Sequence, residues 1–188
     1  MRRPVSVAFA DLGFEHSYTV EVHPEYPSSG DWPIPAVHFG EKGRDTLTIK
    51  VRPRGGEPWV GSFALENRGV VTGVFACPNP DQLLVATGLD AYVLDVGDDP
   101  RHAEALPLHP VTVVRRPTGT DLLLIASFTG VAALDRSGVR WVISHLFRDD
   151  LEVHDGPPGS IRLTGRDPEP SAVVLDIDDG RVLSRKRR

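Results

Sequence analysis

Apolar residues in this chain occur in short runs, each about four to eight residues long and rich in Val, Leu, Ile, Phe and Tyr. Turn residues bound the runs, and this pattern is typical of β-strands. No window of about 11 residues keeps apolar residues at helical spacing without an interrupting Gly or Pro, so no helix is predicted. The 18 glycines and 17 prolines are spread along the chain, which fits many short strands joined by turns.

The apolar runs form an internal repeat. The segment 71–95 can be laid over 111–135 without a gap, and equivalent residues lie 40 positions apart, so that Asp95 falls on Asp135. Repeats of this length, made of short strands, are typical of propeller blades or similar stacked sheets.

We therefore predict an all-β fold built from repeats of four-stranded antiparallel sheets of about 40 residues, in a small, about four-bladed β-propeller or propeller-like arrangement. The chain is expected to form a single domain over 1–188, with repeats at about 17–66, 70–106, 111–145 and 151–184 and an extra strand within 1–16. In the first repeat, the expected first to fourth strands are 18–22, 35–39, 46–51 and 59–65. A closed ring would protect the sheet edges, whereas an open one would favour pairing through the end repeats, so monomer and homodimer both stay open.

The third repeat carries a recognisable signature. Gly130 to Trp141 resembles a blade of the quinoprotein-like (pyrroloquinoline-quinone-type) β-propellers, in which a strand ending Ala-Leu-Asp is followed by a Gly turn and a Trp; here these are Asp135, Gly138 and Trp141. The fourth repeat has the same shape with Leu183 in place of the Trp, and more loosely all the repeats resemble WD40-like blades. The resemblance implies the fold alone, since propeller repeats of this kind occur in enzymes, in scaffold proteins and in binding platforms. No cofactor is expected, because quinone enzymes of this kind have a much longer chain and dedicated ligands.

Charge and hydropathy limit the partners. The net charge of −5 over 188 residues argues against a general nucleic-acid surface. Arginine supplies 18 of the 21 basic residues, as a high-GC coding bias would, and the basic tail 185–188 is expected to be a solvated end. The N-terminal apolar stretch stops at Asp11, too short for a secretory signal, and no stretch approaches the roughly 18 to 20 apolar residues of a membrane span. We expect a cytoplasmic protein with no nucleic-acid and no membrane partner.

Two kinds of residue are expected to be structural. Cys77 is the single cysteine, lies in an apolar run, and fits a reducing compartment and a buried thiol. Asp95, Asp135 and Asp176 recur in register where a strand enters a turn, and there an aspartate bonds the backbone two residues on. Asp81 and Asp121 recur in the same way and are expected to be turn residues too.

One candidate surface follows from the topology of a propeller. The loops that leave each fourth strand share a face with the loops between second and third strands, and function on repeat scaffolds concentrates in such loops. This face is expected to collect Glu66, Asn67, Arg68, His109, His145, Arg148, Asp149, Asp150, Arg166, Asp167 and Glu169. The binding residues predicted from this set are His109, His145, Arg148, Asp149 and Arg166. Arg148 and Arg166 would flank a pocket for an anionic ligand or an acidic partner surface; the alternative is that these loops are polar only because they are solvated.

A second candidate surface is the long segment 24–35, which departs from the repeat and contains Tyr26 and Trp32. It is either a cover over an exposed sheet edge or a contact site.

The sequence contains no G-x-S-x-G, P-loop or G-x-G-x-x-G motif, and its seven histidines form no HExxH pair. The favoured function is therefore a non-catalytic binding or protein-interaction module, whose partner is a protein or a small anionic ligand. The alternative is a small metal-assisted hydrolase or lyase that uses His109, His145 and Asp149 or Asp150.

Overall fold

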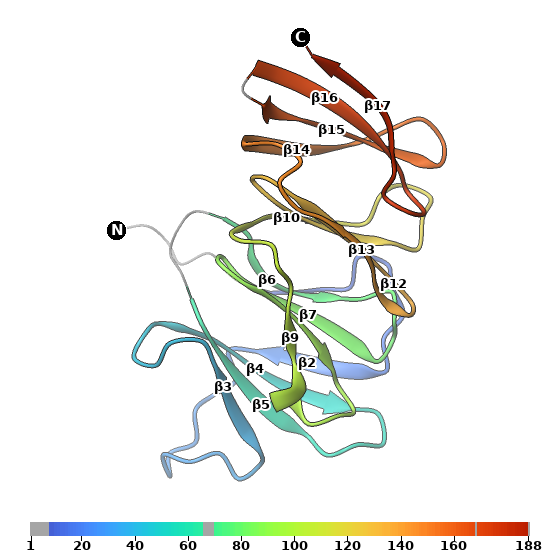
Figure 1. The fold of residues 1–188 in the computed structure, drawn as a ribbon. Coiled ribbons are helices and arrows are strands. Elements are labelled where there is room, and N and C mark those ends of the chain that lie inside the picture. The colour runs from blue at the N-terminus through green and yellow to red at the C-terminus, as the bar shows by residue number, and fades with distance from the viewer. Residues whose placement is uncertain (1–7, 66–69, 168, 188) are drawn as a thin grey trace. The chain divides into compact units, whose positions relative to one another are not determined.

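The computed structural model describes residues 8–65, 70–167 and 169–187 (Figure 1). Its regular elements in this part of the chain are β-strands, apart from one short 3-10 turn, η1 (Pro100–His102). The chain divides into two compact units, Met1–Leu106 and Pro107–Arg188, called here the N-terminal and the C-terminal unit. The predicted all-β fold of four-stranded, blade-like sheets is confirmed.

The N-terminal unit contains two sheets. The first sheet has the strand order β2 (Tyr18–Val22), β4 (Thr46–Pro53), β5 (Trp59–Ala64), β3 (Ala36–Phe39). The second sheet has the order β1 (Phe9–Ala10), β6 (Thr72–Ala76), β7 (Gln82–Thr87), β8 (Ala91–Asp95), β9 (Glu104–Ala105).

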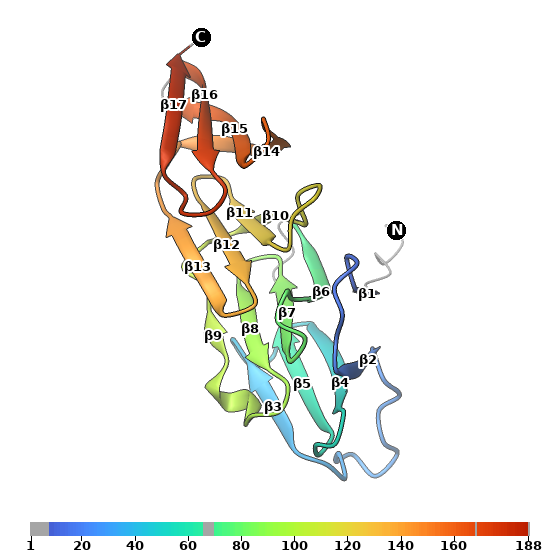
Figure 2. The ribbon, with the colours of Figure 1, turned by 90° about the vertical axis from the view of Figure 1, so that its right-hand side faces the viewer.

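The C-terminal unit contains two four-stranded antiparallel sheets in which each strand pairs with the next along the chain (Figure 2). The third sheet has the order β10 (Val111–Arg115), β11 (Leu123–Ser127), β12 (Val131–Asp135), β13 (Gly138–Ile143). The fourth sheet has the order β14 (Asp149–Asp155), β15 (Ser160–Asp167), β16 (Glu169–Asp176), β17 (Val182–Arg187). Both sheets follow the expected succession of strands.

The first sheet corrects the expected strand order. The strand β3 is not the second strand across the sheet but its outer edge, where it pairs in parallel with β5. The segment 23–35 is therefore a crossover, because it joins β2 to β3 and these two strands are the opposite edges of the sheet. The pattern of apolar residues predicts that a strand exists, but both hydrogen-bonding edges of a strand are alike and do not specify its neighbour.

The extra N-terminal strand belongs to the second sheet. Phe9 and Ala10 form β1, which pairs in parallel with β6. Residues 5–7, the first part of the expected strand, lie outside the described residues.

Each unit has an apolar core between its own two sheets. In the N-terminal unit, Ile49 and Phe63 from the first sheet pack with Leu83 from the second, all fully buried. In the C-terminal unit, Leu124 from the third sheet packs with Leu163 from the fourth. Alternate residues of a strand face opposite sides, so each sheet presents a row of such side chains to its neighbour.

The recurring aspartates build the same turn three times. The backbone N–H two residues on donates to an aspartate Oδ1 in each case: at 3.1 Å for Asp95, 2.7 Å for Asp135 and 2.8 Å for Asp176. This confirms the predicted turn role. Asp81 and Asp121 also lie in a turn and a bend before their strands, as predicted, but their carboxylates have other partners: Asp81 accepts from the Ser17 hydroxyl and Asp121 accepts a guanidinium N–H of Arg116.

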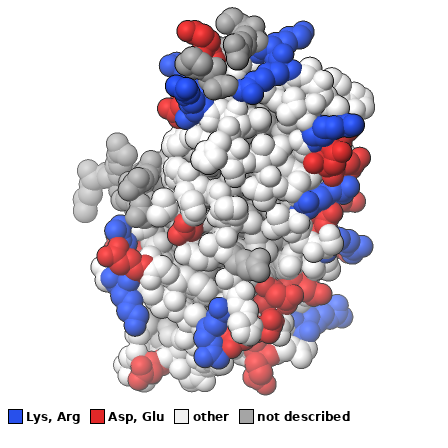
Figure 3. All heavy atoms as spheres, in the orientation of Figure 1, with Lys and Arg blue, Asp and Glu red and all other residues white. Residues whose placement is uncertain are grey.

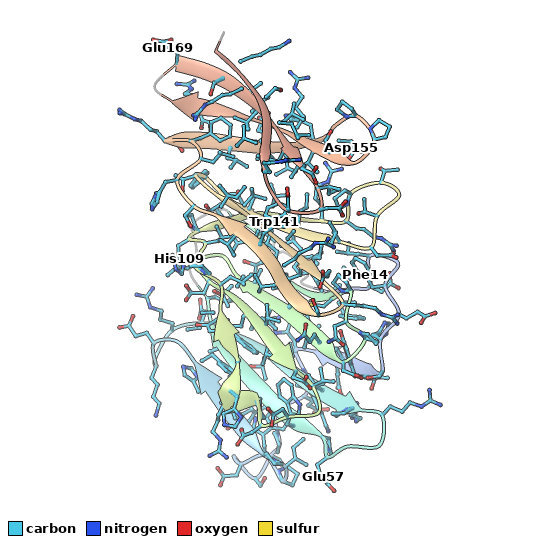
Figure 4. The ribbon with its side chains drawn as sticks, turned by 45° about the vertical axis from the view of Figure 1, so that its right-hand side comes forward. Phe14, Glu57, His109, Trp141, Asp155 and Glu169 are labelled. Carbon is cyan, nitrogen blue, oxygen red and sulfur yellow. The ribbon has the colours of Figure 1, made fainter. Side chains whose placement is uncertain are left out.

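A tryptophan joins the two sheets of each unit at this turn. The indole Nε1–H of Trp59 donates to the Val96 carbonyl at 3.2 Å, and that of Trp141 donates to the Ile177 carbonyl at 3.1 Å (Figure 4). Each acceptor directly follows a recurring aspartate. The ring of Trp141 also covers Gly180, where an added Cβ would lie 2.9 Å from the indole.

Gly180→Ala is expected to destabilise the protein more than Gly119→Ala. Both glycines have φ +72°, so both substitutions place a side chain in the left-handed region, at a cost of about 1–2 kcal/mol. Only Gly180 has a neighbour, Trp141, within 4 Å of the added Cβ, and overpacking there adds roughly 1–3 kcal/mol. Urea denaturation measures both variants; equal losses would contradict the tryptophan contact.

Asp135→Asn is expected to reduce the acid sensitivity of folding. The Ser137 hydroxyl and backbone N–H, with Arg140 nearby, hold the pKa of Asp135 below its usual value. The stabilisation is therefore present above the unfolded pKa of about 3.9 and is lost as pH falls through the lower folded value. Asparagine keeps the turn acceptor, so the stability advantage of wild type should shrink between about pH 5 and pH 3 in urea titrations. Parallel pH profiles would refute the assignment.

Candidate functional site

The predicted loop surface forms at one end of the C-terminal unit. The connection 144–148, which leads from β13 to β14, lies beside the loop 128–130 between β11 and β12. The backbone N–H groups of Leu146 and Phe147 both donate to the Thr129 carbonyl, at 2.7 and 3.2 Å. These bonds fix one loop on the other without the help of exposed side chains. We call this end, with residues 128–130, 144–150 and 166, the loop surface.

Strands of the fourth sheet are tied to the same place. The Arg148 backbone N–H donates to the Arg166 carbonyl at 2.7 Å. The Arg166 Nε lies 2.9 Å from Asp150 Oδ2, and the Arg185 guanidinium donates to the Leu146 carbonyl at 3.2 Å. Loops of two neighbouring sheets thus form one continuous surface.

The structure brings together four of the predicted binding residues: His145, Arg148, Asp149 and Arg166 are all exposed on the loop surface. Asp150 lies with them and pairs with Arg166. His109 (Figure 4) lies in the C-terminal unit, two residues before the start of β10, and is joined to Pro110 by a cis peptide bond.

Three further members of the predicted face, Glu66, Asn67 and Arg68, lie outside the described residues. Asp167 ends β15 and Glu169 begins β16, both in the fourth sheet.

The backbone of the loop surface is conformationally restricted. His145 and Asp150 have φ of 56° and 57°, and non-glycine residues rarely adopt this left-handed region. A pairing irregularity follows between Asp149 and Glu152. Such conformations cost about 1–3 kcal/mol each and persist where the surroundings hold them, often at functional sites.

Phe128 is a residue of this surface that the sequence reasoning missed. Its side chain is 40% exposed, although large aromatic side chains are usually buried. Leu146 and Phe147 lie buried in the same end of the unit. The internal repeat contains the signal that could have found it, because the position 40 residues earlier is Gly88. An aromatic residue has replaced the turn glycine in one repeat only.

Tyr26 and Trp32 belong to the N-terminal unit. They lie in the crossover between β2 and β3, where their rings pack edge to face with centroids 5.4 Å apart. The Tyr26 hydroxyl donates to the Gly30 carbonyl at 2.6 Å, and the residue is 63% exposed. The pair stabilises the crossover itself and leaves one face of Tyr26 in solvent.

Charges of both signs are interspersed on the surface (Figure 3). Arg166 with Asp150, and Arg115 with Asp155, are exposed or half-exposed pairs of this kind. Exposed pairs contribute little to stability, typically about 0–1 kcal/mol, and their main effect here is to compensate charge locally.

A metal site and a membrane-spanning helix are two further features that the geometry can be compared with. Among residues 8–65, 70–167 and 169–187, no group of three or more His, Cys, Asp or Glu side chains is placed to hold a metal ion. In the same residues no helix has the length and apolar character that a membrane span requires.

Similarity to known proteins is found among solved structures, at low sequence identity. No family model matches the chain, and no curated protein matches it by sequence. Among solved structures, BamB from Moraxella catarrhalis is similar at 15% identity and a TM-score of 0.42, over 74% of this chain and 42% of that one. The N-terminal domain of Nup159 is similar at 12% identity and 0.40, over 97% and 54%. A chain of an S. cerevisiae complex of Dbp5 bound to Nup159, Gle1, IP6 and ADP is similar at 12% and 0.39, over 97% and 52%.

The chain thus spans about half the length of the structures it resembles.

Cys77 is expected to be unreactive in the folded protein. The thiol is 1% exposed, and burial raises its pKa, which disfavours the nucleophilic thiolate. A chromogenic disulfide reagent at pH 8 should therefore leave native protein unmodified and should titrate one thiol after denaturation in urea. Rapid labelling of native protein would show that the thiol is accessible.

Proposed function

We propose that this protein is a non-catalytic protein-interaction module and that the loop surface of the C-terminal unit is its binding site. The observation that carries the proposal is Phe128, a large aromatic side chain that is 40% exposed on hydrogen-bonded loops, with Arg148 and Arg166 exposed on the same surface. Aromatic residues and arginines are enriched in the energetically important centres of protein interfaces.

The loop surface is suited to binding because it is fixed before a partner arrives. Leu146 and Phe147 are buried and bond through their backbones to the neighbouring loop. A surface that is already ordered loses less conformational entropy on association, so more of the contact energy becomes affinity.

A protein partner is favoured over a small anion. The guanidinium of Arg166 already has the Asp150 carboxylate at 2.9 Å, and that carboxylate competes with any small anion for the same donors. A protein surface avoids this competition, because it can contact the aromatic ring and pair with acidic and basic groups together. The hydrolase or lyase alternative finds no group of metal-ligating side chains in the described part of the chain.

The proposal can be tested with peptides selected from a random display library against the whole protein. Phe128→Ser and Arg148→Glu should each weaken the selected peptides about tenfold or more, as expected for interface centres. Matched controls are Val139→Ser, an apolar side chain that is 45% exposed, and Arg136→Glu, an exposed arginine in the β12–β13 turn. These should change affinity less than about twofold.

Melting temperatures measured in parallel separate lost binding from lost folding. If no selected peptide depends on Phe128 or Arg148 in variants that remain folded, the loop surface is not the binding site.

A further inference from the structure

The N-terminal unit contains a cavity that the loop surface does not involve. Its volume is about 530 Å³. It is lined by β3 and the residue before it, by the β4–β5 turn with the start of β5, and by the segment that leads from β8 to η1. The lining residues are 35–37, 53, 56–59 and 96–101.

About half of the cavity wall is apolar, and the wall provides few side-chain hydrogen-bond donors. Prolines at 35, 53, 58 and 100 all line the cavity, and proline has no backbone N–H. Trp59, which is 3% exposed, has its single donor occupied by the Val96 carbonyl at 3.2 Å. A ligand that matches such walls must bring its own donors and an apolar portion.

The charged groups of the cavity are mainly acidic. Glu57 (Figure 4), Asp98 and Asp99 are carboxylates, and Arg101 is the one basic lining residue. Arg101 is already engaged, since its Nε lies 2.9 Å from both carboxylate oxygens of Asp99. The guanidinium holds the pKa of Asp99 at about 2, so this pair stays ionised and compensated.

Two carboxylates remain to attract a cation. Glu57 has no ion-pair partner among the described residues. Asp98 accepts the Asp99 backbone N–H on Oδ1 at 2.8 Å, and its Oδ2 lies 3.5 Å from the imidazole of His102, which is outside the lining. The cavity therefore combines proline and tryptophan walls, side-chain donors that are already engaged, and an excess of carboxylates.

We propose that this cavity binds an arginine side chain presented by an extended segment of a partner protein. A guanidinium has five N–H donors and no acceptor, so it complements walls that offer carboxylate acceptors and few free donors. Its flat head and aliphatic stem pack against apolar rings while the head reaches carboxylates. Ala36 and Val37 belong to β3, an edge strand whose neighbour in the sheet is β5, so a partner segment has backbone groups to pair with beside the cavity.

The protein carries its own reporter for this binding. Trp59 lines the cavity, and its indole N–H makes the hydrogen bond that the indole N–H of Trp141 makes in the C-terminal unit. In two-dimensional ¹⁵N NMR spectra of the whole chain, N-acetyl-arginine amide should shift the Trp59 indole signal saturably and leave the Trp141 signal in place. N-acetyl-citrulline amide, a neutral probe of the same shape, should have no effect.

Combined Glu57→Gln and Asp98→Asn should weaken the arginine probe about tenfold or more, or abolish the shift. Asp178→Asn, an exposed acid in the corresponding turn of the C-terminal unit, is the matched control and should leave the titration unchanged. Both variants must retain dispersed spectra. Equal shifts with citrulline, or an unchanged titration in the double variant, would overturn the proposal.

One further probe tests whether the arginine side chain is presented by an extended peptide segment. An extended, capped pentapeptide with a central arginine and threonine and valine on either side should bind more tightly than the amide, and should also shift backbone signals of Ala36 and Val37. A peptide that binds no more tightly than the amide would overturn presentation by a partner segment.

Discussion

The docking of one tryptophan onto the neighbouring sheet is the contact on which each unit depends. A buried tryptophan removes about 150–250 Å² from water, which at about 25 cal/mol per Å² contributes roughly 4–6 kcal/mol. Its hydrogen bond adds only about 1 kcal/mol net. Burial therefore provides the stability, whereas the bonds from Trp59 to Val96 and from Trp141 to Ile177 determine where the sheets meet.

The two candidate surfaces both depend on this tryptophan contact between sheets. In the C-terminal unit, docking fixes the third sheet on the fourth, and backbone hydrogen bonds then hold the loops that display Phe128 and Arg148. In the N-terminal unit, the docked ring of Trp59 is itself part of a cavity wall. The same contact thus supports an outward-facing surface in one unit and a recess in the other.

The sequence predicted the strands and the aspartate turns because both are local properties. Alternating apolar residues and a side chain that bonds the backbone two residues on depend on few neighbours. The position of β3 is not local, because it depends on which edge of β5 is free after β4 has paired. The exposure of Phe128 was not predicted for another reason: the residue occupies the position of Gly88 in the repeat, but its exposure depends on how the loops pack.

The parallel pairings of the N-terminal unit have a consequence for folding during synthesis. Phe9 pairs with Val74, so β1 leaves the ribosome long before the strand that will hold it, and β3 must likewise wait for β5. In the C-terminal sheets each strand pairs with the next one along the chain, so hairpins can form as their strands emerge in succession. Because non-local pairing slows folding, the half of the chain made first is the half that stays open to chaperones longest.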